Sequence, residues 1–175
     1  MLGRAPIVDF DGTLARLGVD WDGLRARLGL TSLDELWTAE EGAGGGGELD
    51  GQAWRAVTAA EVAAAREAQP VERMVSALAR CQGFAVLTGN SQAAVNAFLD
   101  RRPELGSLCL AVAGRETLRG SKRDPAAFSR GFQLCADATK EVRGGDPLVY
   151  VGDLAWELAA ARQLGALAID VTEVL

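Results

Sequence analysis

From Pro70 onward, short apolar runs alternate along the chain with segments of helical character. The runs that predict strands lie at 84–88, 107–113, 148–152 and 166–171. The segments that predict helices lie at 71–81, 91–100, 125–139 and 154–164. One more apolar run, at 5–9, predicts a strand near the start of the chain. Strands that alternate with helices form a parallel sheet with helices on both faces, so we expect an α/β fold.

The segment between the first strand and Pro70 has a different character. Ser32, followed three residues later by Glu35, matches the capping box that opens a helix. Residues 42–47 hold five glycines, which predict a flexible loop. The alanine-rich residues 49–68 predict a long helix. We therefore expect this segment to be a largely helical insertion in the α/β core.

Length and charge narrow the class of protein. The 175 residues suit one domain, or one domain with a small insertion. The formal net charge is −6 and no run of lysine or arginine forms a basic stripe, so a nucleic-acid partner is not expected. No run of about 18 apolar residues predicts a membrane span, and the N-terminus lacks a secretory pattern. These features predict a cytoplasmic protein with no membrane partner.

Cysteine and histidine usage narrows the chemistry. The three cysteines, Cys81, Cys109 and Cys135, are widely spaced and form no CxxC pair, as in proteins that keep their thiols reduced. The sequence contains no histidine. A Ser-His-Asp triad and the common histidine-rich zinc sites are therefore excluded. Acid–base chemistry is left to carboxylates, lysine, tyrosine or water.

Polar and charged residues follow each of the first four predicted strands. In strand order they are Asp9 and Asp11, then Thr88, Gly89 and Asn90, then Lys122, then Asp153 with Glu157 one helical turn later. Ligands of open parallel sheets bind at the carboxyl ends of the strands. We therefore expect these groups to converge on one crevice.

The chemistry of these groups favours a magnesium-assisted phosphoryl transfer. Clustered carboxylates repel one another unless a cation lies between them, and magnesium prefers oxygen ligands. A lysine beside magnesium makes a site for phosphate, to which the Thr88 hydroxyl and the amides of Gly89 and Asn90 could also donate. Asp9 could then attack phosphorus to form an aspartyl-phosphate, with Asp11 as general acid and base.

Four motifs, in the expected order, resemble those of the haloacid dehalogenase-like superfamily. The run Asp9-Phe-Asp-Gly-Thr is similar to its first motif, DxDGT. Leu87-Thr-Gly-Asn90 looks like the second motif of phosphoglycolate phosphatase-like members. Lys122, within Lys-Arg-Asp-Pro, resembles the third. Val151-Gly-Asp153, followed by Glu157, resembles the fourth, so the resemblance extends over nearly the whole chain.

The resemblance implies a fold and a domain organisation. It implies a Rossmann-like catalytic core, residues 1–14 and 71–175, with a five-stranded parallel sheet of order 5-4-1-2-3. It also implies a small helical cap, residues 15–70, inserted after the first strand. The implied function is hydrolysis of a small phosphorylated metabolite, a phosphate monoester, by a magnesium-dependent phosphatase.

The resemblance also implies a role for each motif residue. Asp9 would be the nucleophile and a magnesium ligand, and Asp11 the general acid and base that lends magnesium its backbone carbonyl. Phosphate would bind to Thr88, Gly89, Asn90 and Lys122. Asp153 would ligate the metal, and Glu157 would support the metal or its waters.

The sequence departs from the superfamily pattern at Glu157, where aspartate is usual. An aspartate there would be expected to leave the fold intact and to tighten magnesium binding, because magnesium demands strict geometry. Three other functions stay open at this point. They are a haloacid dehalogenase, against which Asp11 argues, a phosphomutase, against which the short cap argues, and a non-catalytic protein that binds a phosphorylated ligand or partner. The specific ester and the oligomeric state are not predicted.

Overall fold

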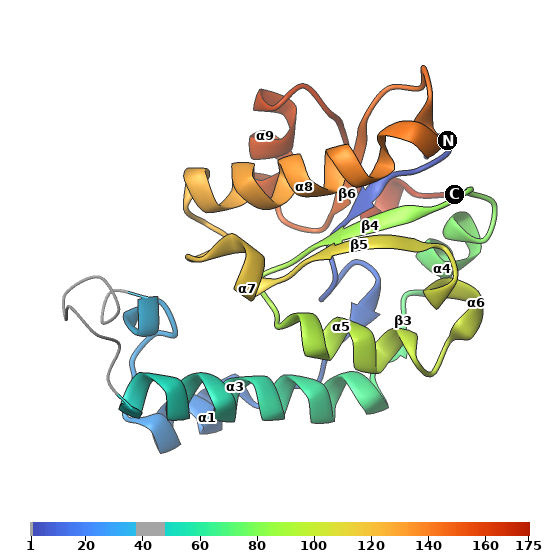
Figure 1. The fold of residues 1–175 in the computed structure, drawn as a ribbon. Coiled ribbons are helices and arrows are strands. Elements are labelled where there is room, and N and C mark those ends of the chain that lie inside the picture. The colour runs from blue at the N-terminus through green and yellow to red at the C-terminus, as the bar shows by residue number, and fades with distance from the viewer. Residues whose placement is uncertain (1, 38–47) are drawn as a thin grey trace.

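Five parallel strands form the central sheet of the computed structural model, which describes residues 2–37 and 48–175 (Figure 1). The strands are β1 (Ile7–Val8), β4 (Phe84–Leu87), β5 (Cys109–Ala113), β6 (Val149–Gly152) and β7 (Leu167–Asp170). Their spatial order is β5-β4-β1-β6-β7, with every pairing parallel. Counted along the chain within this sheet, this is the predicted order 5-4-1-2-3, so the predicted α/β fold is confirmed.

Helices cover both faces of the sheet, which explains why its three central strands are buried throughout. One face carries α8 (Pro125–Arg143) and α9 (Ala155–Gln163). The other face carries α4 (Glu72–Leu78), α5 (Gln92–Leu99) and α6 (Pro103–Gly106) (Figure 1). Phe128 and Tyr150 belong to the buried cluster of the first face, whereas Phe10 and Phe98 belong to that of the second.

The insertion after β1 contains α1 (Trp21–Leu28), a helical turn at 35–37 and α3 (Glu48–Glu67). The side chains of Leu24, Leu36 and Val57 form a small core of its own. α3 packs against α5 of the sheet domain, so the insertion lies over the second face (Figure 1). The glycine-rich loop predicted at 42–47 lies outside the described residues.

The insertion is largely helical, as predicted, but it also contains two short strands that the sequence did not predict. It begins with β2 (Ala15–Arg16) and ends with β3 (Gln69–Pro70), and the two pair antiparallel. Strands of two residues carry no readable alternation of apolar and polar positions. This two-stranded neck fixes the points at which the chain leaves the core and returns to it.

The remaining predicted elements differ from the structure mainly at their ends. The strands predicted at 5–9, 107–113, 148–152 and 166–171 are shorter, and α8 continues beyond the predicted end at 139 to Arg143. Ser91 caps α5 as predicted, since its hydroxyl accepts from the Ala94 amide at 3.3 Å. Three short helices were not predicted, namely α6, α7 (Arg115–Leu118) and η1 (Val171–Glu173).

Among the described helices, none is both long and apolar enough to cross a bilayer. All three cysteines are free thiols.

Candidate active site

Three carboxylates meet at the carboxyl end of the sheet. Asp9 directly follows β1, Asp153 directly follows β6, and Glu157 lies in the first turn of α9. One oxygen of each lies within 4.8 Å of the others. Asp9 and Glu157 are buried, whereas Asp153 is exposed. β1 and β6 are neighbours in the sheet, and Asp9 and Asp153 each directly follow one of them, so the pairing of these strands brings the two acids together.

Lys122 bridges two of these carboxylates from the loop before α8. Its Nζ lies 2.5 Å from Asp9 Oδ1 and 2.6 Å from Glu157 Oε2. Burial alone would lower the pKa of Lys122, but the two carboxylates more than offset this and raise it. Burial raises the pKa of Asp9 to about 7, and Glu157 adds to this rise while Lys122 opposes it. With one ammonium among three carboxylates, the site has a surplus of acidic groups that suits a cation.

Glu157 is fully buried and accepts hydrogen bonds from four donors. Its Oε1 accepts from the backbone amides of Asp153 and Leu154, at 3.1 and 3.2 Å. Its Oε2 accepts from the Tyr150 hydroxyl at 3.0 Å as well as from Lys122. The glutamate therefore fixes both the lysine and the backbone that carries Asp153. A residue at the third position of a helix that accepts from the N-cap amide is half of a capping box.

Two glycines leave room for these acids. A Cβ on Gly12, whose φ is +87°, would collide with the carboxylate of Asp153. A Cβ on Gly152 would collide with the carboxylate of Glu157. The Gly12 position also requires a left-handed backbone that other residues rarely adopt. The close approach of these carboxylates thus explains why glycine occupies both positions, Gly12 in the first motif and Gly152 in the fourth.

Asp11 lies two residues after Asp9 and is half-buried. Its Oδ1 accepts from the Leu17 amide at 2.9 Å, which fixes the carboxylate beside the start of the insertion. Burial raises the pKa of Asp11, although the backbone amides of Leu17 and Gly12 oppose the rise. Its side chain is not part of the three-carboxylate cluster among the described residues, so its predicted metal contact through the backbone carbonyl remains a prediction.

The loop after β4 is close to Lys122, and the Thr88 hydroxyl is bonded within the loop itself. The Thr88 hydroxyl donates to Asn90 Oδ1 at 3.0 Å and accepts from the Asn90 amide at 3.1 Å. Gly89 is exposed, and a Cβ on it would lie 3.5 Å from the Cβ of Lys122. Gly89, Asn90 and Lys122 also line one cavity. Their role in phosphate binding stays a prediction that this placement permits.

Comparison with solved structures identifies the fold. A hydrolase from Pseudomonas syringae superposes with a TM-score of 0.66 at 15% identity, over 96% of this chain and 83% of that one. A candidate phosphoglycolate phosphatase from Lactobacillus plantarum superposes with a TM-score of 0.64 at 14% identity, over 98% of this chain and 87% of that one. The L-2-haloacid dehalogenase of Xanthobacter autotrophicus, with chloropropionic acid covalently bound, superposes with a TM-score of 0.57 at 15% identity. The match covers 94% of this chain and 76% of that one.

The chain has the haloacid dehalogenase-like fold. The predicted resemblance is confirmed at this level, because these structures match nearly the whole chain. Identities this low establish the fold and do not establish the activity. Neither protein-family models nor curated protein sequences match the chain.

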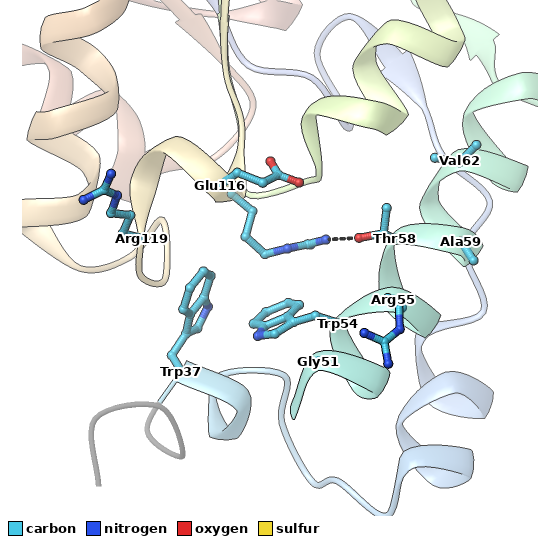
Figure 2. Close-up of a pocket in the computed structure, with 10 residues that line it drawn as sticks. Trp37, Gly51, Trp54, Arg55, Thr58, Ala59, Val62, Glu116 and Arg119 are labelled. Atoms are coloured by element: carbon cyan, nitrogen blue, oxygen red, sulfur yellow. Dashed lines mark hydrogen bonds between the residues drawn. The ribbon is translucent and has the colours of Figure 1, made fainter. Parts of the chain in front are cut away.

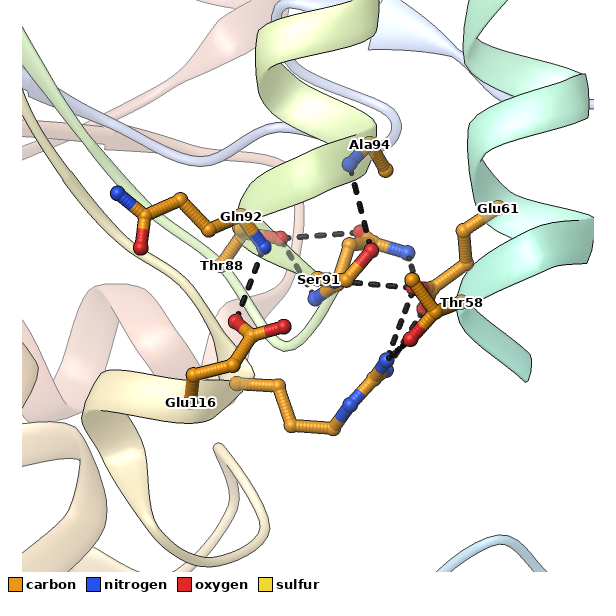
Figure 3. A network of polar contacts seen from close by, with 9 residues as sticks. Thr58, Glu61, Thr88, Ser91, Gln92, Ala94 and Glu116 are labelled. Atoms are coloured by element: carbon orange, nitrogen blue, oxygen red, sulfur yellow. Dashed lines mark hydrogen bonds and ion pairs between the residues drawn. The ribbon is translucent and has the colours of Figure 1, made fainter. Parts of the chain in front are cut away.

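Within the haloacid dehalogenase-like fold, a carboxylate from the insertion reaches the core, and sequence reasoning missed it. Glu61 of α3 is buried, and it accepts from Asn90 Nδ2 at 3.2 Å and from the Ser91 amide at 2.9 Å (Figure 3). Arg115, at the start of α7, donates to both of its oxygens, at 2.9 and 3.1 Å. Arg115 also donates to the Thr58 hydroxyl at 2.9 Å.

This network joins the insertion to the loop that carries the second motif. Glu61 satisfies the amide side chain of Asn90, and Asn90 in turn accepts from Thr88. The guanidinium of Arg115 is bonded to Glu61, and its Cζ lies 4.4 Å from the centroid of the Trp54 ring. A buried, bidentate pair of this kind fixes geometry because breaking it would leave a charge without a partner. The position of the insertion is therefore tied to the shape of the Thr88–Asn90 loop.

Proposed function

We propose that this protein is a magnesium-dependent phosphatase that hydrolyses a small phosphate monoester through an aspartyl-phosphate on Asp9. The observation that carries the proposal is the contact of Lys122 with Asp9, 2.5 Å apart, beside the exposed carboxylate of Asp153. A buried carboxylate beside an ammonium and two further acids matches what phosphoryl transfer needs, namely a nucleophile and charge compensation for phosphate. Asp11 supplies the acid–base group two residues away.

The donor set fits a magnesium ion. Carboxylate oxygens from Asp9, Asp153 and Glu157 lie within 4.8 Å of one another, and hard oxygen ligands suit Mg²⁺. Asp9 and Asp153 would hold the ion through their side chains and Asp11 through its backbone carbonyl. Glu157 would support the site by fixing Asp153 and adding negative charge, since its oxygens already accept four hydrogen bonds. When bound, the ion would neutralise charge on the phosphate oxygens.

The protein's own residues would carry out two half-reactions. An Asp9 oxygen attacks phosphorus while the ester P–O bond breaks, and the leaving oxygen takes a proton from Asp11. Water then attacks the phosphorus of the aspartyl-phosphate and gives a proton to Asp11, which frees Asp9 and inorganic phosphate. Lys122 holds the Asp9 carboxylate in place and offsets the charge of the phosphate. The raised pKa of Asp11, caused mainly by burial, favours its protonated form for the first step.

The alternatives have weaker support. A dehalogenase would attack carbon with the same aspartate and would have no use for a proton donor at Asp11. A phosphomutase would need an insertion that shields the aspartyl-phosphate from water. A binding protein without turnover would hold the phosphorylated ligand at the same site but would carry out neither half-reaction. Release of inorganic phosphate from a generic ester, with and without Mg²⁺ and compared with Asp9→Asn, separates these functions.

A further inference from the structure

A small cavity adjoins Lys122 on the side of the insertion. It has a volume of about 260 Å³ and reaches from Gly89, Asn90 and Lys122 in the core to the first helices of the insertion. A phosphate held by Lys122 would direct its esterified group into this space. The residues that line the cavity therefore bear on which ester the protein accepts.

Tryptophan is the most frequent residue type in the walls of this cavity. The chain has four tryptophans, and all of them line it, namely Trp21, Trp37, Trp54 and Trp156. Three come from the insertion and one from α9, so aromatic side chains face the cavity from both parts of the protein. Each is half-buried, so part of each indole remains accessible.

Packing explains some of these tryptophans better than others. Trp21 and Trp54 pack against the small core of the insertion, and Trp156 packs against the core face beneath α8. Trp37 belongs to neither cluster, and the centroid of its ring lies 4.7 Å from that of Trp54. Figure 2 shows the two indoles side by side. The same pair also borders a second cavity of about 710 Å³ between α3 and α7. Trp37 and Trp54 therefore border both cavities.

The size and charge of the cavity restrict the ligand. An engineered apolar cavity of about 150 Å³ is known to bind benzene, so 260 Å³ suits one or two fused rings. Among the charged residues of the lining, Glu61 pairs with Arg115, and Lys122 contacts Asp9 and Glu157. The others, Asp34 and Arg123, have opposite signs. The lining thus has one basic side chain in excess, and because the phosphate itself would contact Lys122, no further positive charge is left for a second acidic group on the ligand.

We propose that the substrate is a phosphate monoester of an aromatic or heteroaromatic alcohol, whose ring lies among the indoles of this cavity. The proposal rests on the proposed phosphatase function, and it adds the class of the esterified group. Aromatic pairs attract beyond the area they bury, because the face of one ring and the edge of another carry opposite partial charges. A saturated ring of the same size has no such partner interaction.

The test compares two ligands of similar size, one with an aromatic ring and one with a saturated ring. Benzylphosphonate and cyclohexylmethylphosphonate are non-hydrolysable, and the saturated one is the more hydrophobic. We expect calorimetry with Mg²⁺ to show roughly tenfold tighter binding of benzylphosphonate. Equal affinity, tighter binding of the saturated ligand, or no binding of either would overturn the inference.

Two substitutions of Trp37 test whether the indole wall causes the preference. Trp37→Leu should bring the affinity ratio of the two phosphonates toward one, whereas Trp37→Phe, which keeps an aromatic face, should retain most of it. A ratio in Trp37→Leu equal to that of the wild type would contradict the role of the wall.

Turnover separates this inference from the function on which it rests. Benzyl phosphate and cyclohexylmethyl phosphate have similar leaving groups, so their kcat/KM values should differ in the same direction as the affinities. Hydrolysis of both esters at equal kcat/KM would overturn the aromatic preference and leave the phosphatase standing. Tighter binding of benzylphosphonate without hydrolysis of either ester would support the ligand class and count against the phosphatase.

Discussion

The carboxylate of Glu157 lies 2.6 Å from the ammonium of Lys122, and this contact joins the first turn of α9 to the loop before α8. The same carboxylate accepts from the amides of Asp153 and Leu154 and from the Tyr150 hydroxyl. One buried side chain thus fixes the lysine and the backbone of an exposed acid. The longer side chain of Glu157, where aspartate is usual, therefore lets one carboxylate reach all four donors.

Glu157→Asp should destabilise the protein, which reverses the expectation from sequence. The shorter side chain cannot reach all four donors, and buried donors without partners are costly. We expect a loss of roughly 2–4 kcal/mol in the free energy of unfolding, measured by urea denaturation without Mg²⁺. Glu141→Asp, on an exposed position of α8, is the matched control and should change little. Equal stability of the two variants would show that the network around Glu157 contributes nothing.

Gly12→Ala should remove activity and lower stability. The added Cβ would collide with the Asp153 carboxylate, and the φ of +87° is strained for alanine. We expect a cost of about 1–3 kcal/mol in unfolding free energy, together with loss of phosphate release. Gly18→Ala is the control, because nothing lies within 4 Å of a Cβ there. If both variants release phosphate as fast as the wild type, the steric argument for Gly12 is wrong.

Glu61 and Arg115 should be strongly coupled in a double-mutant cycle. Either Glu61→Gln or Arg115→Met leaves a buried charge without its partner. Each single substitution should therefore lower the free energy of unfolding by more than half of the loss caused by both together. We expect a coupling energy of about 2–3 kcal/mol from urea denaturation of the four proteins.

The exposed pair of Arg101 and Glu67, 3.5 Å apart, is the control cycle. Both side chains are largely in solvent, so this pair should show little coupling. Similar coupling in the two cycles would mean that the buried pair does not hold the insertion to the core.

Stability should fall at alkaline pH in a way that depends on Cys135. Burial raises the pKa of this thiol to about 12 from an ordinary value of 9.0. In the unfolded chain the thiol loses its proton at lower pH than in the folded one, so the unfolding free energy decreases as pH rises between these values.

The check compares wild type with Cys135→Ala in urea at about pH 8 and about pH 10. Because the variant lacks this ionisable thiol, its loss of unfolding free energy between the two pH values should be smaller than that of the wild type, by at most ~1.4 kcal/mol per pH unit. An identical loss in both proteins would show that the thiol ionises in the folded state as it does in the unfolded state.

The sequence predicted the sheet and the positions of Asp9 and Asp153 because these depend on local patterns. Each acid directly follows an apolar run, and parallel strands place their carboxyl ends at one edge. Lys122 was predicted only by its place before Asp-Pro and by the resemblance, since a lone lysine carries no pattern of its own. The contact with Glu157 was not predicted, because it depends on how α9 packs.

Glu61 could not be predicted from sequence at all. It lies in an alanine-rich helix, where a single glutamate is typical of a solvated face, and its partner Arg115 is 54 residues away. The pairing exists only because α3 packs onto α5, which is a tertiary contact. The two-residue strands β2 and β3 were missed for a related reason, since their pairing depends on the return of the chain and not on side-chain alternation.

The most direct test of the proposed function is the hydrolysis of para-nitrophenyl phosphate by the purified protein, with and without Mg²⁺. The proposal predicts release of phosphate that requires Mg²⁺ and that is lost in Asp9→Asn, with the variant still folded by circular dichroism. Release that persists in Asp9→Asn, or no release by the folded wild type with Mg²⁺ from this or any other phosphate ester, would contradict the assignment of Asp9 as the nucleophile of a phosphatase.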